Sequence, residues 1–289
     1  MSAIGWVERR GTAVWRRRAN RLLVYALLLV VAAIMLYPFW LMGQMSFRSL
    51  PQYYLGKGFS LTTWADLFKA LPIGRQLLNS TLITVSAILI ILVCSTTGGY
   101  ALGTLRYRFS GVVFLITVSA MMVPMQSLII PEYINLANVN LGFTHLHLIN
   151  HYYGAILVYA ALGTPFATFL MTTYFRRLPE DVIEASLIDG LGYGKIFFRI
   201  MLPLAVPAIV TVAVLQFIQI WDDLLVGLLF LQTNAQRTIT VGLETIPAQH
   251  FQDFPMEMAG SLISALPAVV VYLVFQRYLI RGLTMGMSK

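Results

Sequence analysis

The chain has 289 residues, the length of one or two soluble domains, but its composition excludes that class. Hydrophobic residues make up 58% of the chain and charged residues 11%, and the mean hydropathy is +0.76, which is typical of a protein that crosses a membrane several times. The net charge of +8 is compatible with nucleic acid or anionic lipid as a partner, and the positions of the charges decide between the two. The single cysteine, Cys94, excludes an internal disulfide and a cysteine-based metal site.

The N-terminal 42 residues are a basic arm, 1–21, followed by an apolar span, 22–42. A cleaved signal peptide has the same order of charge and hydrophobicity. However, the span is long, has no A-x-A cleavage site and runs into Tyr37-Pro38-Phe39-Trp40, an aromatic run typical of a membrane interface. These features favour an uncleaved first transmembrane helix.

Five further apolar segments each have the roughly 20 residues that about 30 Å of hydrocarbon requires. Prolines interrupt one of them at Pro124 and Pro131, and another contains Pro165. The chain is therefore predicted to be an all-α membrane protein with six transmembrane helices. The five segments lie at about 81–105, 112–134, 153–175, 204–230 and 259–280.

Six spans place both termini on one side of the membrane, and the basic residues favour that side. It would hold fifteen of the 20 Lys and Arg residues: six in the arm, two in the turn 106–111, four in 176–203 and three at the C-terminus. By the positive-inside rule, both termini are cytoplasmic. The net charge is thus a topology signal and an attraction to anionic lipid, not a nucleic-acid surface. The predicted parts are the cytoplasmic arm 1–21, the first helix 22–42, an external segment 43–75, a five-helix core 76–281 and a cytoplasmic tail 282–289.

The stretch 176–203 is polar in an otherwise apolar region, with four basic and four acidic residues. Pro179 suits the first turn of a helix, the acids at 180 and 181 suit its positive end, and Gly190 suits the left-handed residue that ends it. We therefore expect a short helix, a glycine turn and a second helical segment. Asp189 opposes the helix dipole in the last turn, which suggests another duty for its carboxylate.

Three pieces of this stretch, Glu184-Ala185-Ser186, Asp189-Gly190 and Ile200-x-Leu202-Pro203, together resemble a known family signature. It is the "EAA…G…I.LP" signature of the membrane subunits of binding-protein-dependent ABC importers. In that family the loop holds the coupling helix, which docks into a cleft on the cytoplasmic ATPase. Ser186 and Leu191 stand where alanine is common, and we expect both on the surface of the docking element.

Other segments resemble the sugar-importing branch of the family. They are Asn79-Ser80, Trp221-Asp222-Asp223-Leu224 and the ending 276–284, which is similar to the "QR…GLT.G" tail of the maltose-type second permease subunit. Asp222 departs from the asparagine frequent in the family. The resemblance implies the type I ABC importer permease fold and covers most of the chain.

The resemblance implies a coupling role for part of the stretch. The apolar side of the helix, Val182, Ile183 and Leu187, would fill a pocket on the ATPase, and Glu184, on the same face as Glu180, would meet a basic or N–H partner there. The predicted ATPase-coupling residues are Glu184, Ala185, Ser186, Leu187, Asp189, Gly190 and Pro203.

Carboxylates inside a membrane segment are expensive, which makes Asp222 and Asp223 candidates for the solute pathway. One would line the cavity near a polyhydroxylated solute, and the other would hydrogen-bond a neighbouring helix. Structural caps or subunit-interface pairs are the alternative. Trp221 beside them suits either stacking on a sugar or a place at the membrane interface.

Two motifs carry little weight. His145, His147 and His151 have spacing compatible with zinc, but no Cys, Asp or Glu nearby completes the set, so we expect no metal site. The glycines at 190, 192 and 194 follow a helix instead of a strand, and the sequence contains no Walker motif. The chain is therefore expected to be non-catalytic, with no cofactor of its own and with ATP and Mg on a partner ATPase. The outward loop 244–258 could reach a binding protein or be a solvated connector.

The resemblance implies a subunit of an ATP-driven importer in the bacterial or archaeal inner membrane, which moves a di- or oligosaccharide by alternating access. The implied partners are two ATPase subunits, a second homologous permease, an external solute-binding protein, the sugar and the lipid bilayer. A permease for another solute, such as glycerol phosphate or an amino acid, is the alternative. An ATP-independent secondary transporter would leave the stretch 176–203 without a role.

Overall fold

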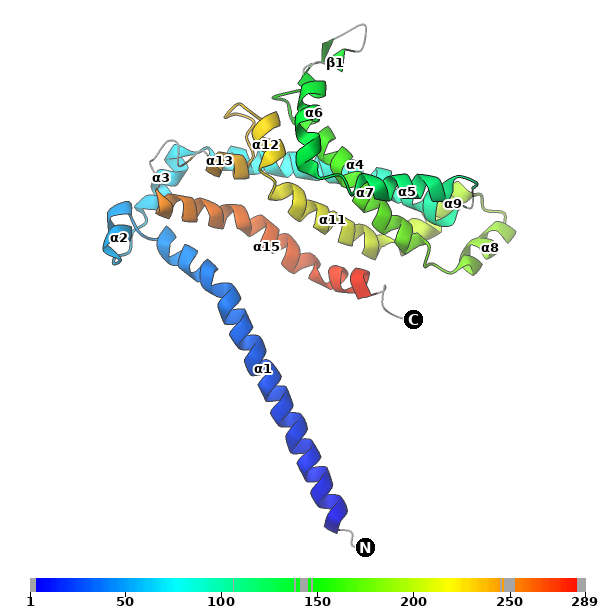
Figure 1. The fold of residues 1–289 in the computed structure, drawn as a ribbon, viewed down its shortest axis with the longest axis horizontal. Helices are drawn as coiled ribbons and strands as arrows, with labels where there is room; N and C mark the ends of the chain where they lie inside the picture. The colour runs from blue at the N-terminus through cyan, green and yellow to red at the C-terminus, as the bar shows by residue number, and fades with distance from the viewer. Residues whose placement is uncertain are drawn as a thin grey trace. The chain divides into compact units, whose positions relative to one another are not determined.

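The computed structural model describes residues 4–105, 107–137, 139–140, 145–146, 148–244, 246 and 253–284. The chain divides into two compact units. The first contains residues 1–67 and 253–262, and the second contains residues 68–252 and 263–289. Figure 1 shows the elements of both units, coloured along the chain.

The first unit begins with α1 (Ile4–Ser46), a long helix whose apolar part starts at Asn20. Its side chains from 20 to 40 are all exposed. The predicted external segment then forms α2 (Leu50–Leu55) and begins α3 (Thr62–Ala70). The link between them is held by Phe47, which stacks on the ring of Phe59 at a centroid distance of 5.4 Å.

The apolar segments form the predicted helices, with shifted ends. Among the described residues, four helices are long and apolar enough to cross a membrane, and two bent helix pairs raise the number to six if each pair counts as one span. The second predicted span begins at residue 73 instead of 81, and the sixth begins at 254 instead of 259, which shortens the predicted loop 244–258. The unbent spans after α1 are α4 (Ile73–Thr104), α7 (Tyr152–Phe175) and α15 (Phe254–Thr284).

The span predicted at 112–134 is a bent pair, α5 (Ser110–Ala120) and α6 (Met125–Ala137), with an angle of 95° between the two helices. Pro124 immediately precedes α6, where it disfavours helical backbone in the residue before it. Pro131, the second predicted interruption, lies inside α6. The bend thus follows only the first of the two prolines.

A hairpin of two short strands is the one departure from all-α structure among the described residues. Strand β1 (Val139–Asn140) pairs antiparallel with β2 (His145–Leu146). The strands are two residues long, so the all-α class predicted from the sequence is confirmed.

The core of the second unit lies where α4 packs along α7, and small residues permit the closest approach (Figure 1). A Cβ atom added at Gly99 of α4 would lie 2.5 Å from the Cβ of Met171 and 2.9 Å from the backbone nitrogen of Thr172, both on α7. At Gly103, one turn later, a Cβ would lie 2.9 Å from the carbonyl oxygen of Thr172. Helices in lipid associate through such small-residue contacts, because close packing takes the place of hydrophobic burial.

A side-chain latch, made by Asn79 and Ser80 of α4, fastens the segment that follows α12 (Leu225–Phe230). The amide nitrogen of Asn79 donates to the carbonyl oxygens of Ala235 at 3.1 Å and Arg237 at 3.0 Å. Its amide oxygen accepts a hydrogen bond from the Tyr152 hydroxyl at 2.9 Å. The Ser80 hydroxyl accepts the backbone N–H of the first residue of α13 (Ile239–Glu244) at 2.9 Å.

Replacing Asn79 with alanine is expected to remove three hydrogen bonds and to leave two carbonyl groups without this donor. At about 1 kcal/mol for each bond, the loss is roughly 2–4 kcal/mol. For a chain of this size that corresponds to a fall of about 5–10 °C in the midpoint of thermal unfolding, measured in detergent. Asn234→Ala, an exposed amide of the same segment, is the matched control and should leave the midpoint unchanged. Equal midpoints for the two variants would mean that the latch contributes no stability.

Candidate functional site

The stretch 176–203 contains the predicted helix, α8 (Glu180–Ile188), and both of its ends have the predicted chemistry. Pro179 is the residue before the first turn, and that turn contains two acidic residues. Gly190 has a φ of 78°, the left-handed conformation that glycine adopts without a steric penalty. The N–H of Leu191 then donates to the Ser186 carbonyl at 3.0 Å, which satisfies an end of the helix. Local sequence alone therefore sets the length of α8.

The second helical segment is also present and is irregular. Helix α9 (Tyr193–Ile196) continues into a wide π-helical turn, η1 (Phe197–Met201), and then into α10 (Leu202–Leu204), which contains Pro203. The segment meets α11 (Val206–Trp221) at an angle of 70°. Pro203 thus lies next to the bend between this irregular segment and α11.

The packed side of α8 differs from the prediction. Ser186 is 6% exposed, and its hydroxyl donates to the Val182 carbonyl at 2.6 Å. Leu191 and Ile183 are half-buried and pack against the hydrophobic core of the chain itself. The expectation that Ser186 lies on the surface of the docking element is wrong, and Leu191 is only partly exposed. Ile183, predicted to fill a pocket on the ATPase, is partly buried against this core.

The exposed large apolar side chains of α8 lie in its last turn. Ile188, which the sequence-based site did not include, is 86% exposed, and Leu187 beside it is also exposed. An exposed isoleucine at the end of a short helix is unremarkable alone, since exposed apolar side chains are common. Here it lies between the two pieces of the family signature in α8 and the turn after it.

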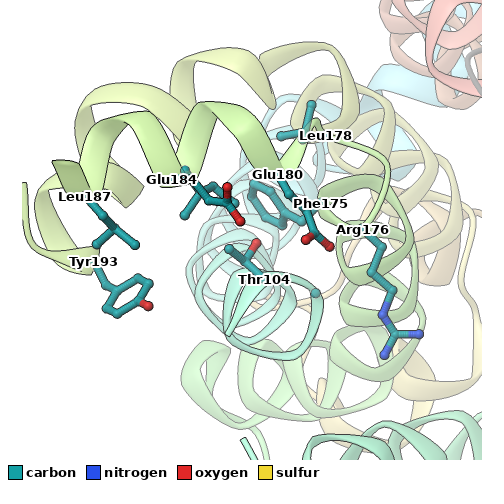
Figure 2. Close-up of a pocket in the computed structure, with 10 residues that line it drawn as sticks. Thr104, Phe175, Arg176, Leu178, Glu180, Glu184, Leu187 and Tyr193 are labelled. Carbon is teal, nitrogen blue, oxygen red and sulfur yellow. The ribbon is translucent and has the colours of Figure 1, made fainter. Parts of the chain in front are cut away.

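A cavity of about 250 Å³ separates α8 from the ends of α4 and α7. Figure 2 shows Glu180 and Glu184 on the same side of α8, with both side chains directed toward Thr104 at the end of α4. Arg176 points away from them, and its guanidinium lies 4.3 Å from the ring centroid of Phe114. The lining residues are Gly103, Thr104, Phe175, Arg176, Leu178, Glu180, Ile183, Glu184, Leu187 and Tyr193.

The cavity is acidic in character. Two carboxylates line it, and Arg176, the one basic residue that the described part of the chain adds to its lining, has its guanidinium over the ring of Phe114. The hydroxyl oxygen of Thr104 is buried and has no hydrogen-bond partner among the described residues. A basic side chain or an N–H donor therefore suits this cavity, which is the kind of partner predicted for Glu184.

The second candidate set, at the end of α11, differs from the predicted arrangement. The helix expected to run through 204–230 ends at Trp221, and α12 begins only at Leu225. Asp222 is exposed, whereas the side chain of Asp223 accepts hydrogen bonds from the Tyr159 hydroxyl of α7 and from the N–H of Val226, each at 2.9 Å. An aspartate that accepts an N–H three residues later competes with helical continuation. The break in the helix is therefore built by Asp223.

Trp221 is buried, with 3% of its surface exposed. Its indole N–H donates to the Ser264 carbonyl at 2.9 Å, its ring stacks on Phe217, and its own carbonyl accepts from the Thr240 hydroxyl. The ring offers no face to a solute in this conformation. Of the three predicted pathway residues, only Asp222 and Asp223 are accessible, and Asp223 makes the bond to a neighbouring helix that was expected of one of them.

Two polar residues that line a cavity were not singled out from the sequence. A cavity of about 500 Å³ lies at the bend between α5 and α6 and contains Glu132 and Gln219. The signal for Glu132 was a single carboxylate in an apolar segment, the same signal that pointed to Asp222. The sequence did not indicate a functional role for Gln219, because its side chain is uncharged and does not stand out in an apolar helix as a carboxylate does.

The histidine motif is only partly described. His151 is the residue before α7, and its ring stacks on Tyr153 at 4.9 Å. His147 lies outside the described residues. The described residues hold no group of three or more metal-ligating side chains.

Comparison with known proteins identifies the family. Residues 95–284 match the family described as "Binding-protein-dependent transport system inner membrane component". The osmoprotective compounds uptake permease protein GgtD of Synechocystis is 32% identical over 241 residues, which cover 83% of this chain and 76% of the relative. The diacetylchitobiose uptake system permease protein NgcG of Streptomyces coelicolor is 29% identical, with coverage of 91% and 87%. The arabinooligosaccharides transport permease AraQ of Bacillus subtilis is 31% identical, with coverage of 72% and 71%.

Solved structures share the fold. A chain of a bacterial ABC transporter that imports alginate superposes with a TM-score of 0.75 at 23% identity, over 90% of this chain and 96% of that one. A chain of the MetNI methionine ABC transporter gives a TM-score of 0.55 at 16% identity, over 73% and 95%. With the family match over residues 95–284, the chain belongs to the inner membrane components of binding-protein-dependent transport systems, as an ABC importer permease subunit.

Proposed function

We propose that this permease subunit translocates a sugar, of di- or oligosaccharide size, that an external binding protein delivers. The observation that carries the proposal is the set of relatives that match most of the chain. Their names refer to diacetylchitobiose, arabinooligosaccharides and melibiose, raffinose or stachyose. These solutes differ in monosaccharide and linkage but share size and dense hydroxyl groups, which supports the class and not one member of it.

The proposed mechanism is alternating access driven by a partner. Two ATPase subunits bind ATP and Mg and close on each other, and this chain contributes no catalytic group and no cofactor. Helix α8 transmits the closure, with Glu184 meeting a basic or N–H group and Ile188 making the apolar contact. Ala185, Ser186, Leu187, Asp189, Gly190 and Pro203 belong to the same ATPase-coupling segment, in which Ser186 is buried and its hydroxyl bonds within α8.

Two further partners complete the proposed assembly in the lipid bilayer. The exposed apolar surface of α1 supports contact with a second, homologous permease as well as with lipid. The distribution of Lys and Arg supports cytoplasmic termini and a cytoplasmic α8. The opposite side of the membrane would then receive the binding protein.

The test is ATP hydrolysis by the complex reconstituted with the ATPase, second permease and binding protein encoded beside this chain. Neutral mono- and disaccharides, glycerol phosphates and amino acids are added one at a time. We expect a sugar to stimulate hydrolysis at least fivefold, and Glu184→Ala to abolish the stimulation without changing the affinity of the binding protein for that sugar. Stimulation only by a glycerol phosphate or an amino acid would mean that the transported solute belongs to that class and is not a sugar. Failure to assemble with any ATPase would overturn the whole proposal.

A further inference from the structure

The cavity at the bend between α5 and α6 has the composition of a small-molecule site. Its volume of about 500 Å³ lies within the range of roughly 300–1,000 Å³ that ligand pockets occupy. Its walls come from four helices and are mostly apolar, with Phe166 of α7 as the aromatic member. The other lining residues are Ala120, Met121, Val123, Pro124, Met125, Leu128, Glu132, Ala161, Leu162, Pro165 and Gln219.

Glu132 is the feature of this cavity that points to a ligand. One oxygen of its carboxylate, Oε2, is buried and has no hydrogen-bond partner among the described residues. A buried carboxylate oxygen without a donor is costly, and native structures rarely keep one without a functional reason. Gln219, from α11, supplies an amide to the same cavity. The site therefore combines a carboxylate, one oxygen of which lacks a donor, with an amide that can both donate and accept.

A smaller neighbouring cavity extends the same chemistry. The two cavities share Met125, Leu162 and Gln219 in their linings, and the smaller one adds Gln216 and Asp223. The amide oxygen of Gln216 is also buried without a hydrogen-bond partner among the described residues. Among the described residues, no Lys, Arg or His lines either cavity. The polar surface of both is thus dominated by acceptors, with two carboxylates and no fixed positive charge.

We propose that this cavity is a solute subsite of the translocation path and that Glu132 restricts it to uncharged, hydroxyl-rich sugars. The inference rests on the proposed function, since it assumes that a sugar crosses this chain. Sugar hydroxyls donate to the Glu132 carboxylate and hydrogen-bond the Gln219 amide, and the apolar wall with Phe166 receives the C–H face of the ring. An acidic sugar is excluded, because its carboxylate would enter a cavity that already holds a carboxylate and no cation.

The test is protection of an engineered cysteine by solute, measured on the whole complex in nanodiscs without the binding protein. In a Cys94→Ser background, Met121→Cys places a thiol in the cavity lining, and Met122→Cys places one on the neighbouring residue, which does not line the cavity and is 81% exposed. The probes are the neutral disaccharide that best stimulates ATP hydrolysis in the panel above and digalacturonate. The rate of labelling by a polar maleimide is recorded with each.

We expect the neutral disaccharide to slow labelling of Met121→Cys at least threefold and digalacturonate to leave it unchanged, with Met122→Cys unaffected by both. Adding Glu132→Gln to Met121→Cys should weaken protection by the neutral sugar, because the anionic acceptor is lost. Equal protection at both thiols, protection by digalacturonate, or no protection by a sugar that does stimulate hydrolysis would overturn the subsite. A panel in which no sugar stimulates hydrolysis overturns the proposed function instead, so the two failures are distinguishable.

Discussion

Replacing Ile188 with aspartate is expected to separate the chain from its proposed ATPase partner and to abolish solute-stimulated ATP hydrolysis. Ile188 is the most exposed apolar side chain of α8, at 86%, and it follows directly on the turn that the family signature occupies. In a docked complex its side chain would enter an apolar part of the ATPase cleft. A carboxylate buried there without a partner loses its hydration. Replacing a central apolar residue of an interface typically costs roughly 2–4 kcal/mol of binding free energy.

That loss corresponds to association weakened by about 30-fold to 1,000-fold. The measurement is co-purification of the ATPase with the permease pair, followed by solute-stimulated hydrolysis. Ile188→Leu is the matched control, since it keeps volume and apolar character and should retain both. If the aspartate variant co-purified and hydrolysed ATP like the unmodified chain, the last turn of α8 would not be part of the docking surface.

Local chemistry explains why α8 could be predicted from the sequence. A proline and two acids at the start and a glycine after the end define a short helix without help from the rest of the chain. The face that α8 buries could not be predicted the same way. Ser186 is buried, and Ile183 packs against a core to which α4, far away in the sequence, also contributes. Helical periodicity shows which residues share a face, but not what covers that face.

The break in the fifth apolar span shows the same limit. The segment 204–230 is mostly apolar, and its polar residues besides the two aspartates are uncharged, so periodicity extended one helix through them. The helix ends because Asp223 binds the hydroxyl of Tyr159 on α7 and the N–H of Val226. One of these partners is 64 residues away, and its position is a result of the fold. The cavity that contains Glu132 is likewise formed only when α5, α6, α7 and α11 meet.

Replacing Gly99 with leucine is expected to prevent stable folding of the second unit. A Cβ at this position would lie 2.5 Å from the Cβ of Met171 and 2.9 Å from the backbone nitrogen of Thr172, so α4 and α7 would have to move apart. The shift would continue to Gly103, where an added Cβ would lie 2.9 Å from the carbonyl oxygen of Thr172, and to the ends of both helices, where the cavity beside α8 is formed. Overpacking of this kind costs about 1–3 kcal/mol for a small excess, and more where backbone opposes backbone.

The graded series Gly98→Ala, Gly99→Ala and Gly99→Leu separates this contact from the general cost of losing a glycine. A Cβ at Gly98 meets its nearest neighbour, the Thr168 methyl group, at 3.5 Å, an ordinary van der Waals distance. Gly98→Ala should therefore keep the thermal midpoint, Gly99→Ala should lower it by about 5–10 °C, and Gly99→Leu should fail to accumulate as a folded subunit. Thermal unfolding in detergent and size-exclusion profiles give the three outcomes. Equal midpoints for the two alanine variants would show that α4 and α7 can separate at little cost, and α8 would then have no rigid support through which to transmit motion.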